Sequence, residues 1–328
     1  MNLLKFPLLV QHRVYQELSI LELFILSLTS RRVKTFIKLF KWEVHGVLFS
    51  FMKKEVYFFF QDSNELWQRN KFQIPLDANF VCYREDETDV FYYHFKRKKC
   101  GSTLALELQQ HIFDLFSTAS KQLKLTVFIE NIQSYRWISS VGRASISSMR
   151  MVALEKFVKR HPTLKYLILR EEMPYYLSPT SSIFSLRNLS VYVREKSFMY
   201  YLQYFRGTHA VFEGCVPIVQ VHEFIEKWID GDYYENLKLV HITKTLRGEP
   251  FLQELLDRYQ VKKQDRSKTP KFFPYNEEDL FYLSDQTNQI AFNGSLFIEN
   301  KKNDKVASIQ FTSKCMKFYI WRKEDIFP

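Results

Sequence analysis

The 328-residue sequence contains few glycines and prolines, and it lacks the motifs of the common enzyme classes. Its 8 Gly are scattered singly, so no glycine-rich phosphate loop is present, and 10 Pro with 8 Gly leave little room for long flexible linkers. Neither a GxSxG elbow nor an HExxH zinc motif occurs. The acidic pairs lie in expected loops, where a solvated face or a helix cap explains them. We therefore expect a non-enzymatic protein without a cofactor, a catalytic residue or a metal site.

The 4 cysteines are Cys82, Cys100, Cys215 and Cys315. No two of them form a CxxC pair, and no histidine stands at metal-ligand spacing from any of them. Widely separated cysteines of this kind are typical of reduced thiols. We find no signal peptide and no apolar run near the ~20 residues of a membrane span. The sequence thus predicts a cytoplasmic or nuclear protein that makes no membrane contact.

Aromatic residues are abundant, with 31 Phe and 19 Tyr, and hydrophobic residues make up 46% of the chain. This composition argues against disorder and favours a core rich in strands. The net charge is +11, and residues 96–99 form the densest basic cluster. Nucleic acid, an acidic partner or an anionic membrane surface could account for such a charge. Because the basic residues are scattered and not interleaved with aromatics, a basic solvated surface is favoured and a nucleic-acid partner is disfavoured.

The N-terminal segment, residues 6–39, has the strongest helical pattern. Leu18, Leu21, Ile25 and Leu28 recur near one face of a helix, and a basic stretch begins at Ser30. A segment this short cannot form a core of its own, so its apolar faces must pack on the rest of the chain or on a partner. The pattern by itself is equally typical of an ordinary amphipathic helical hairpin.

The sequence of this segment resembles an F-box of the large nematode family. The resemblance is carried by Phe6-Pro7-Leu8-Leu9 and by ELFILSLTSRR at residues 22–32, which is similar to the family's ELFxLSLxSKR signature. Gln11-His12 stand where the family has a Leu-Pro pair, and the spacing from Pro7 to Glu22 is short. The resemblance implies three short helices that dock on the Skp adaptor of a cullin-based (SCF) ubiquitin ligase. The residues expected to contact the adaptor are Pro7, Leu8, Leu9, Val14, Leu18, Leu21 and Leu23.

A second resemblance lies at residues 219–242, which are similar to the F-box-associated domain that accompanies the nematode F-box. It is carried by the arrangement Phe-x-x-x-Trp-x-x-Gly, from Phe224 through Trp228 to Gly231, and by an Asn236-Leu237 strand ending at Ile242. The spacing of Val221, Phe224, Ile225 and Trp228 also predicts one apolar helix face, with Gly231 ending the helix.

The fold class that we expect is α+β. A short N-terminal helical segment is followed by strands and by helix–strand units, and a C-terminal β meander with a hairpin turn at Asn293-Gly294 closes the chain. Four short segments have similar sequences, which suggests loosely leucine-rich-repeat-like units, with a plain α/β domain as the alternative. These segments are LKLTVFI, LKYLILR, LRNLSVYV and LKLVHIT. The expected domains are 1–41, F-box-like, and 42–328, a substrate-recruiting region with the F-box-associated core at about 150–245.

Together the two resemblances imply an adaptor that recruits a substrate protein to an SCF-type ligase. The Skp adaptor and the cullin complex would be its partners, and the chemistry would belong to other subunits. The alternative is a basic nucleic-acid-associated protein, or a general interaction module with a degenerate F-box.

Overall fold

The computed structural model describes residues 5–40, 42, 44, 46–51, 55–61, 72–75, 81–82, 93–94, 101–116, 124–131, 141–148, 151–171, 176–194, 197–231, 233–243, 254, 257–259, 261–263, 272–273, 290–291, 296–311 and 315–326. The basic cluster 96–99 and the turn at Asn293-Gly294 lie outside these residues. The chain divides into two compact units. Unit 1 comprises residues 1–148 and 160–163, and unit 2 comprises residues 149–159 and 164–328.

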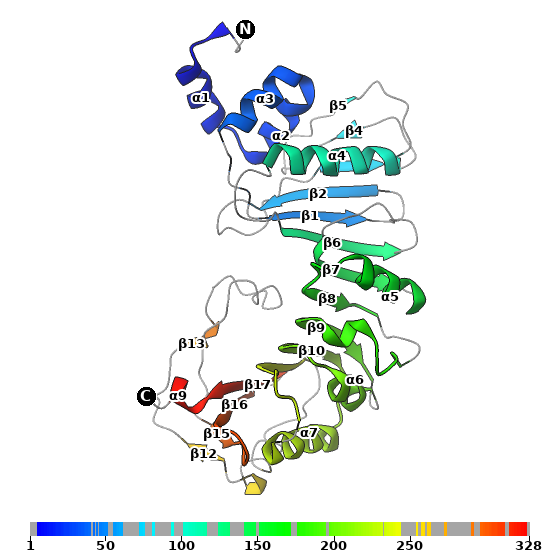
Figure 1. The fold of residues 1–328 in the computed structure, drawn as a ribbon, viewed down its shortest axis with the longest axis vertical. Helices are drawn as coiled ribbons and strands as arrows, with labels where there is room; N and C mark the ends of the chain where they lie inside the picture. The colour runs from blue at the N-terminus through cyan, green and yellow to red at the C-terminus, as the bar shows by residue number, and fades with distance from the viewer. Residues whose placement is uncertain are drawn as a thin grey trace. The chain divides into compact units, whose positions relative to one another are not determined.

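Unit 1 begins with helices and continues as a small sheet with one long helix (Figure 1). Its helices are α1 (Leu8–Gln16), α2 (Ile20–Thr29), α3 (Arg31–Leu39) and α4 (Gly101–Phe116). Its strands are β1 (Gly46–Phe51), β2 (Glu55–Gln61), β3 (Phe72–Pro75), β4 (Val81–Cys82), β5 (Tyr93–His94), β6 (Lys124–Asn131) and β7 (Val141–Ser148).

The main sheet of unit 1 has the order β7-β6-β1-β2-β3. β1, β2 and β3 are antiparallel neighbours, whereas β6 runs parallel to both β1 and β7. Buried Phe49 of β1 and Phe58 of β2 are register partners, and their rings meet edge to face with centroids 4.4 Å apart. Such cross-strand aromatic pairs stabilise a sheet beyond the area they bury.

Unit 2 alternates helices with parallel strands and ends in an antiparallel meander. Its helices are α5 (Met151–Arg160), η3 (Ser182–Ser185), α6 (Phe198–Tyr204), α7 (Ile218–Asp230) and α9 (Lys323–Ile326). Its strands are β8 (Tyr166–Leu169), β9 (Asn188–Val193), β10 (His209–Gly214), β11 (Leu239–Thr243), β12 (Lys262–Lys263), β13 (Phe272–Phe273), β14 (Ile290–Ala291), β15 (Leu296–Glu299), β16 (Lys305–Phe311) and β17 (Cys315–Arg322).

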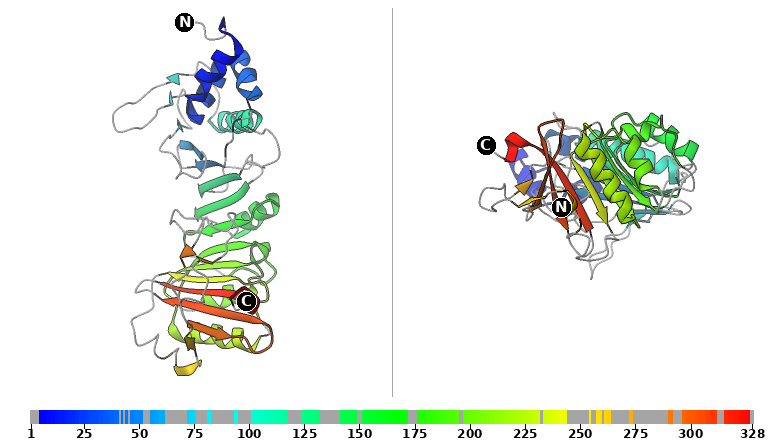
Figure 2. Two further views of the ribbon diagram at one scale, coloured as in Figure 1. Left: turned by 90° about the vertical axis from the view of Figure 1, so that its left-hand side faces the viewer. Right: turned by 90° about the horizontal axis from the view of Figure 1, so that it is seen from below.

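The sheet of unit 2 runs in the order β12-β15-β16-β17-β11-β10-β9-β8. β8 to β11 are parallel to one another, and β15, β16 and β17 continue the sheet as an antiparallel meander. Helices α6 and α7 lie on one face of the parallel strands (Figures 1 and 2). Phe198 of α6 packs edge to face on Phe212 of β10, with ring centroids 4.7 Å apart.

The apolar face predicted for α7 is confirmed, because Val221, Phe224, Ile225 and Trp228 are all buried. The Trp228 ring meets Phe318 of β17 edge to face, which packs the helix on the meander as well as on the parallel strands. Gly231 ends α7 in a left-handed conformation with φ 87°, as its position predicted. The residues of the second family resemblance on this helix are therefore core residues.

The mixed α/β fold, the N-terminal helices and the C-terminal meander agree with the expected architecture. Two expectations differ from the structure. The compact units do not divide at residue 41, because the N-terminal helices contact α4 and belong to unit 1. Residues 289–299 were expected to form one hairpin, but β14 pairs with β13, whereas β15 pairs with β12 and β16.

Candidate functional site

The N-terminal helices are separated by short capped junctions. Pro7 precedes α1, where its fixed φ suits a helix start. Ser19 and Glu22 form a capping box at the start of α2: the Ser19 hydroxyl accepts from the Glu22 main chain, and the Glu22 carboxylate accepts from the Ser19 main chain. Ser30 alone separates α2 from α3, in an extended conformation, and its hydroxyl accepts from the Arg32 main chain at 3.2 Å. These caps explain why the segment forms three helices.

Helix α2 forms the interior of this segment. Four of its apolar side chains are buried: Ile20, Leu21, Leu23 and Phe24. Ser27 is also buried, and its hydroxyl donates to the Phe24 carbonyl at 2.5 Å within the helix. A helix that is apolar on most sides is expected to be surrounded by other elements, as α2 is.

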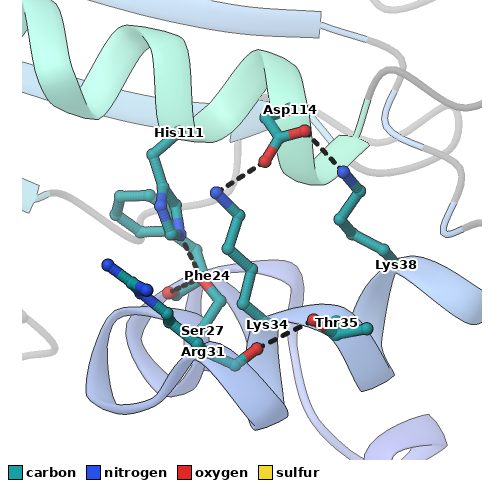
Figure 3. A network of polar contacts seen from close by, with 8 residues as sticks. All are labelled: Phe24, Ser27, Arg31, Lys34, Thr35, Lys38, His111 and Asp114. Atoms are coloured by element: carbon teal, nitrogen blue, oxygen red, sulfur yellow. Dashed lines mark hydrogen bonds and ion pairs between the residues drawn. The ribbon is translucent and has the colours of Figure 1, made fainter.

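A polar network joins α2 and α3 to α4 (Figure 3). Nε2 of His111 on α4 lies 2.6 Å from Oγ of Ser27. Because that hydroxyl already donates to the Phe24 carbonyl, His111 acts as the donor through its Nε2 hydrogen. The Phe24 ring packs edge to face against the same imidazole, with centroids 5.9 Å apart.

The charged part of the network is centred on Asp114. Its carboxylate binds the ammonium groups of Lys34 at 2.6 Å and Lys38 at 2.5 Å, both from α3. These hydrogen bonds lower the pKa of Asp114 to about 2. Burial, and next the positive charge of Lys34, lower the pKa of His111 to about 4. The imidazole is therefore neutral near pH 7, which matches its role as a donor to Ser27.

Helix α1 packs on α3 through one side only. His12 stacks on Phe40 with centroids 4.2 Å apart, and buried Tyr15 lies against Phe36 with centroids 5.3 Å apart. Gln11 is buried on the same side, where its amide donates to the Phe6 carbonyl at 2.6 Å. The aromatic contacts thus fix the orientation of α1 on α3, and the Gln11 hydrogen bond holds the residues that lead into α1.

Apolar residues of α1 are exposed to solvent outside its contact with α3. Leu9 is 78% exposed, and Val10 and Val14, one helical turn apart, are exposed as well. At 100° per residue Leu9 and Val10 fall on the side away from Gln11 and Tyr15, and Val14 lies at the edge of that side. Leu8 is the first residue of the helix and is exposed on the side of Tyr15. We call Leu8, Leu9, Val10 and Val14 the α1 apolar surface. Clustered exposed apolar residues on an ordered helix are typical of a protein interaction site.

The structure divides the residues predicted to contact a Skp adaptor into two groups. Pro7, Leu8, Leu9 and Val14 are exposed on or before α1, and Leu18 is half-buried. Leu21 and Leu23 are only 3% and 0% exposed, so assigning them to the partner surface is a misreading. They pack inside the helical segment, because α2 is enclosed by its neighbours. A partner could reach them only if the helical segment unfolded.

Two exposed apolar residues of this segment were missed. Val10 completes the α1 apolar surface, and its i, i+4 spacing from Val14 was the signal that could have identified it. Leu39, at the end of α3, is 64% exposed. Its exposure depends on where α3 ends, which the apolar pattern of residues 33–40 does not reveal.

The arrangement offers an exposed apolar surface of the kind that binds a partner. Among the described residues, no group of three His, Cys, Asp or Glu side chains is placed to hold a metal ion. Within the same part of the chain, no helix is long and apolar enough to cross a membrane.

Comparisons with protein-family models, with curated proteins and with solved structures gave no match.

Proposed function

We propose that this chain is a non-catalytic substrate adaptor of an SCF-type ubiquitin ligase. The α1 apolar surface binds the Skp adaptor, and the region 42–328 holds a substrate protein. The observation that carries the proposal is a helix held on α3 through His12 and Tyr15, with Leu9, Val10 and Val14 exposed outside that contact. The F-box-like sequence motifs at residues 6–9 and 22–32 also support the proposal.

The energetics favour a partner on this surface. Burying a Leu or Val side chain stabilises by roughly 1.5–3 kcal/mol. Leu9, Val10 and Val14 are held by a helix whose rear face is already packed, so little backbone ordering is needed on binding. Together they could serve as anchors that dominate the affinity.

Positive charge within and just before the surface indicates the kind of groove that fits. Lys5 and Arg13 are exposed beside the apolar residues. A partner with an apolar groove and acidic residues facing Arg13 and Lys5 would complement both features, and the charges would mainly raise the association rate. The Skp adaptor would need such a groove.

In unit 2 the finer fold that we propose is a leucine-rich-repeat-like array. The parallel strands β8 to β11 are joined through η3, α6 and α7, so each helix–strand unit packs on the next. A rigid array of this kind could hold a substrate while the ligase acts. Catalysis would arise from proximity, because binding raises the effective concentration of substrate lysines near the conjugating enzyme.

The test is capture of a purified Skp adaptor by the full chain. The double variant Leu8→Ala, Leu9→Ala should bind more weakly, with each truncation contributing about 1–3 kcal/mol. Point variants are preferable to deletion of the segment, because Phe24 and Ser27 contact α4 and their loss would disturb unit 1.

A matched control is the double variant Val152→Ala, Val219→Ala, which truncates exposed apolar residues on α5 and α7 of unit 2. We expect this control to bind the Skp adaptor like the wild type. If the wild type captured no adaptor, or if both double variants lost binding equally, the proposed function would be rejected.

A further inference from the structure

A line of basic residues precedes the parallel strands of unit 2. Lys165 stands directly before β8, Arg187 before β9 and Lys238 before β11. β10 is preceded by Thr208, with Arg206 two residues earlier. Tyr166, Asn188, His209 and Leu239 are aligned in register, so the residues before them form the next row of the sheet. We call Lys165, Arg187 and Lys238, together with Arg206 two residues before the Thr208 position, the basic row.

The main chain holds this row in place. The Asn188 amide donates to the Lys165 carbonyl at 2.9 Å, and the Thr208 amide donates to the Arg187 carbonyl at 2.8 Å. The Lys238 amide in turn donates to the Thr208 carbonyl at 2.7 Å. The sheet ladder therefore extends to Lys165, Arg187 and Lys238, and these three basic side chains start from a rigid backbone.

Gly207 makes the close approach of Thr208 to Arg187 possible. A Cβ atom at this position would lie 2.1 Å from the Leu186 carbonyl oxygen and 2.7 Å from that of Arg187. Any side chain would push the start of β10 away from β9, so glycine is required here on steric grounds.

The row presents its charge to solvent. Lys165, Arg206 and Lys238 are exposed, and Arg187 is half-buried. Adjacent strands are about 4.8 Å apart, so the row from Lys165 to Lys238 spans about 14 Å. Four positive charges within that distance attract a linear anion.

We propose that the basic row binds an acidic polypeptide segment in extended conformation. An extended chain rises about 3.3 Å per residue, so four or five residues cover the row and their carboxylates or phosphates can reach successive basic side chains. A single-stranded nucleic acid fits less well, because such sites combine basic residues with aromatic stacking platforms. The row positions themselves are Lys, Arg and Thr, and exposed Tyr233 lies under the Lys227 ammonium, 5.8 Å from its ring centre.

This inference deepens the proposed function, since an acidic segment is the substrate class that the adaptor would recruit. The two can fail separately. Skp capture depends on the α1 apolar surface in unit 1, whereas the basic row lies in unit 2. A chain that binds acidic peptide but no Skp adaptor would reject the proposed function and leave the basic row as a peptide site.

The experiment measures fluorescence anisotropy of a labelled decaglutamate peptide with the full chain. The test variant is Lys165→Gln, Arg206→Gln, Lys238→Gln, and the control is Lys156→Gln, Arg170→Gln, Arg194→Gln, which removes the same charge from other exposed positions of unit 2. We expect the test variant to bind about tenfold more weakly and the control to match the wild type. Wild-type binding should also weaken as salt rises, because exposed charges are screened.

Three outcomes would overturn the proposal: absence of wild-type binding at low salt, an equal loss in the test and control variants, or tighter binding of a ten-residue oligothymidylate that the test variant abolishes. The last result would assign the row to nucleic acid. If thermal melting shows that the triple variant is unfolded, the single variants Lys165→Gln and Lys238→Gln replace it, and each should weaken binding about twofold.

Discussion

The Nε2 atom of His111 lies 2.6 Å from Oγ of Ser27, and this contact joins the middle of α4 to the middle of α2. Its neighbours reinforce it, because Phe24 packs on the same imidazole and Asp114, one turn further along α4, binds Lys34 and Lys38. The N-terminal helices are thereby part of the core of unit 1. A partner that docks on α1 would be held against the whole unit through these contacts.

We expect unit 1 to lose stability as the pH falls from about 6.5 towards about 4. The folded-state pKa of His111 is lowered from 6.5 to about 4, so in this window the unfolded state binds a proton that the folded state does not. The stabilisation is complete above 6.5 and is lost as the pH falls through the window. Urea unfolding at a series of pH values measures the change.

The variant His111→Gln isolates this contribution. His161 and His241 also have pKa values lowered to about 4 by burial, so the wild-type curve sums several groups. The difference in unfolding free energy between wild type and variant should vary with pH only between about 4 and 6.5. A difference that stays constant across this range would contradict the buried, neutral state of His111.

Leu23→Ala should destabilise the protein by about 2–5 kcal/mol, because the side chain is fully buried in α2 and its loss leaves a cavity. Leu9→Ala on the exposed side of α1 is the matched control and should change stability by less than about 0.5 kcal/mol. Urea denaturation of both variants gives the comparison. Similar losses in the two would mean that α1 is packed on its outer side too.

Asn300→Ala should destabilise unit 2 by about 1–3 kcal/mol. The Asn300 amide donates to the Trp228 carbonyl at 2.5 Å, and its oxygen accepts from the main chains of Lys302 and Asn303. This buried side chain thus holds the turn before β16 against the end of α7. Lys301→Ala, which removes an exposed ion pair with Asp230, should cost at most about 1 kcal/mol. Chemical denaturation monitored by Trp fluorescence compares the variants, and an equal cost would refute this role.

Gly207→Ala should destabilise unit 2 by about 1–3 kcal/mol, because the added methyl overlaps the Leu186 carbonyl. We also expect weaker binding of the decaglutamate peptide, since the start of β10 moves away from Arg187. Arg206→Ala is the neighbouring control, with an exposed side chain and a small effect on stability. A Gly207→Ala protein with unchanged melting temperature and unchanged decaglutamate affinity would show that the close approach is not needed.

Elements with strong local signals could be predicted from the sequence. Helix α7 follows from the spacing of Val221, Phe224 and Trp228, and its end follows from Gly231. Strand β7 was missed, because VGRASISS has few apolar residues and becomes a strand through pairing with β6. Tertiary pairing decided its structure where local pattern could not.

The candidate sites were only partly predictable for the same reason. Helix α2 is apolar on most of its circumference, so periodicity could not tell that Leu21 and Leu23 face inward while Leu9 on α1 faces solvent. The basic row was not predicted either, because Lys165, Arg187 and Lys238 become neighbours only through the order and register of β8 to β11.

The most direct test of the central claim is hydrogen exchange of the full chain with and without a purified Skp adaptor. The account predicts that the adaptor slows exchange in residues 7–17, which contain the α1 apolar surface, and leaves α6 and α7 unchanged. The Leu8→Ala, Leu9→Ala variant should lose that protection while keeping the wild-type melting temperature. Unchanged exchange in residues 7–17 at saturating adaptor, or protection confined to unit 2, would contradict the claim that α1 is the docking surface.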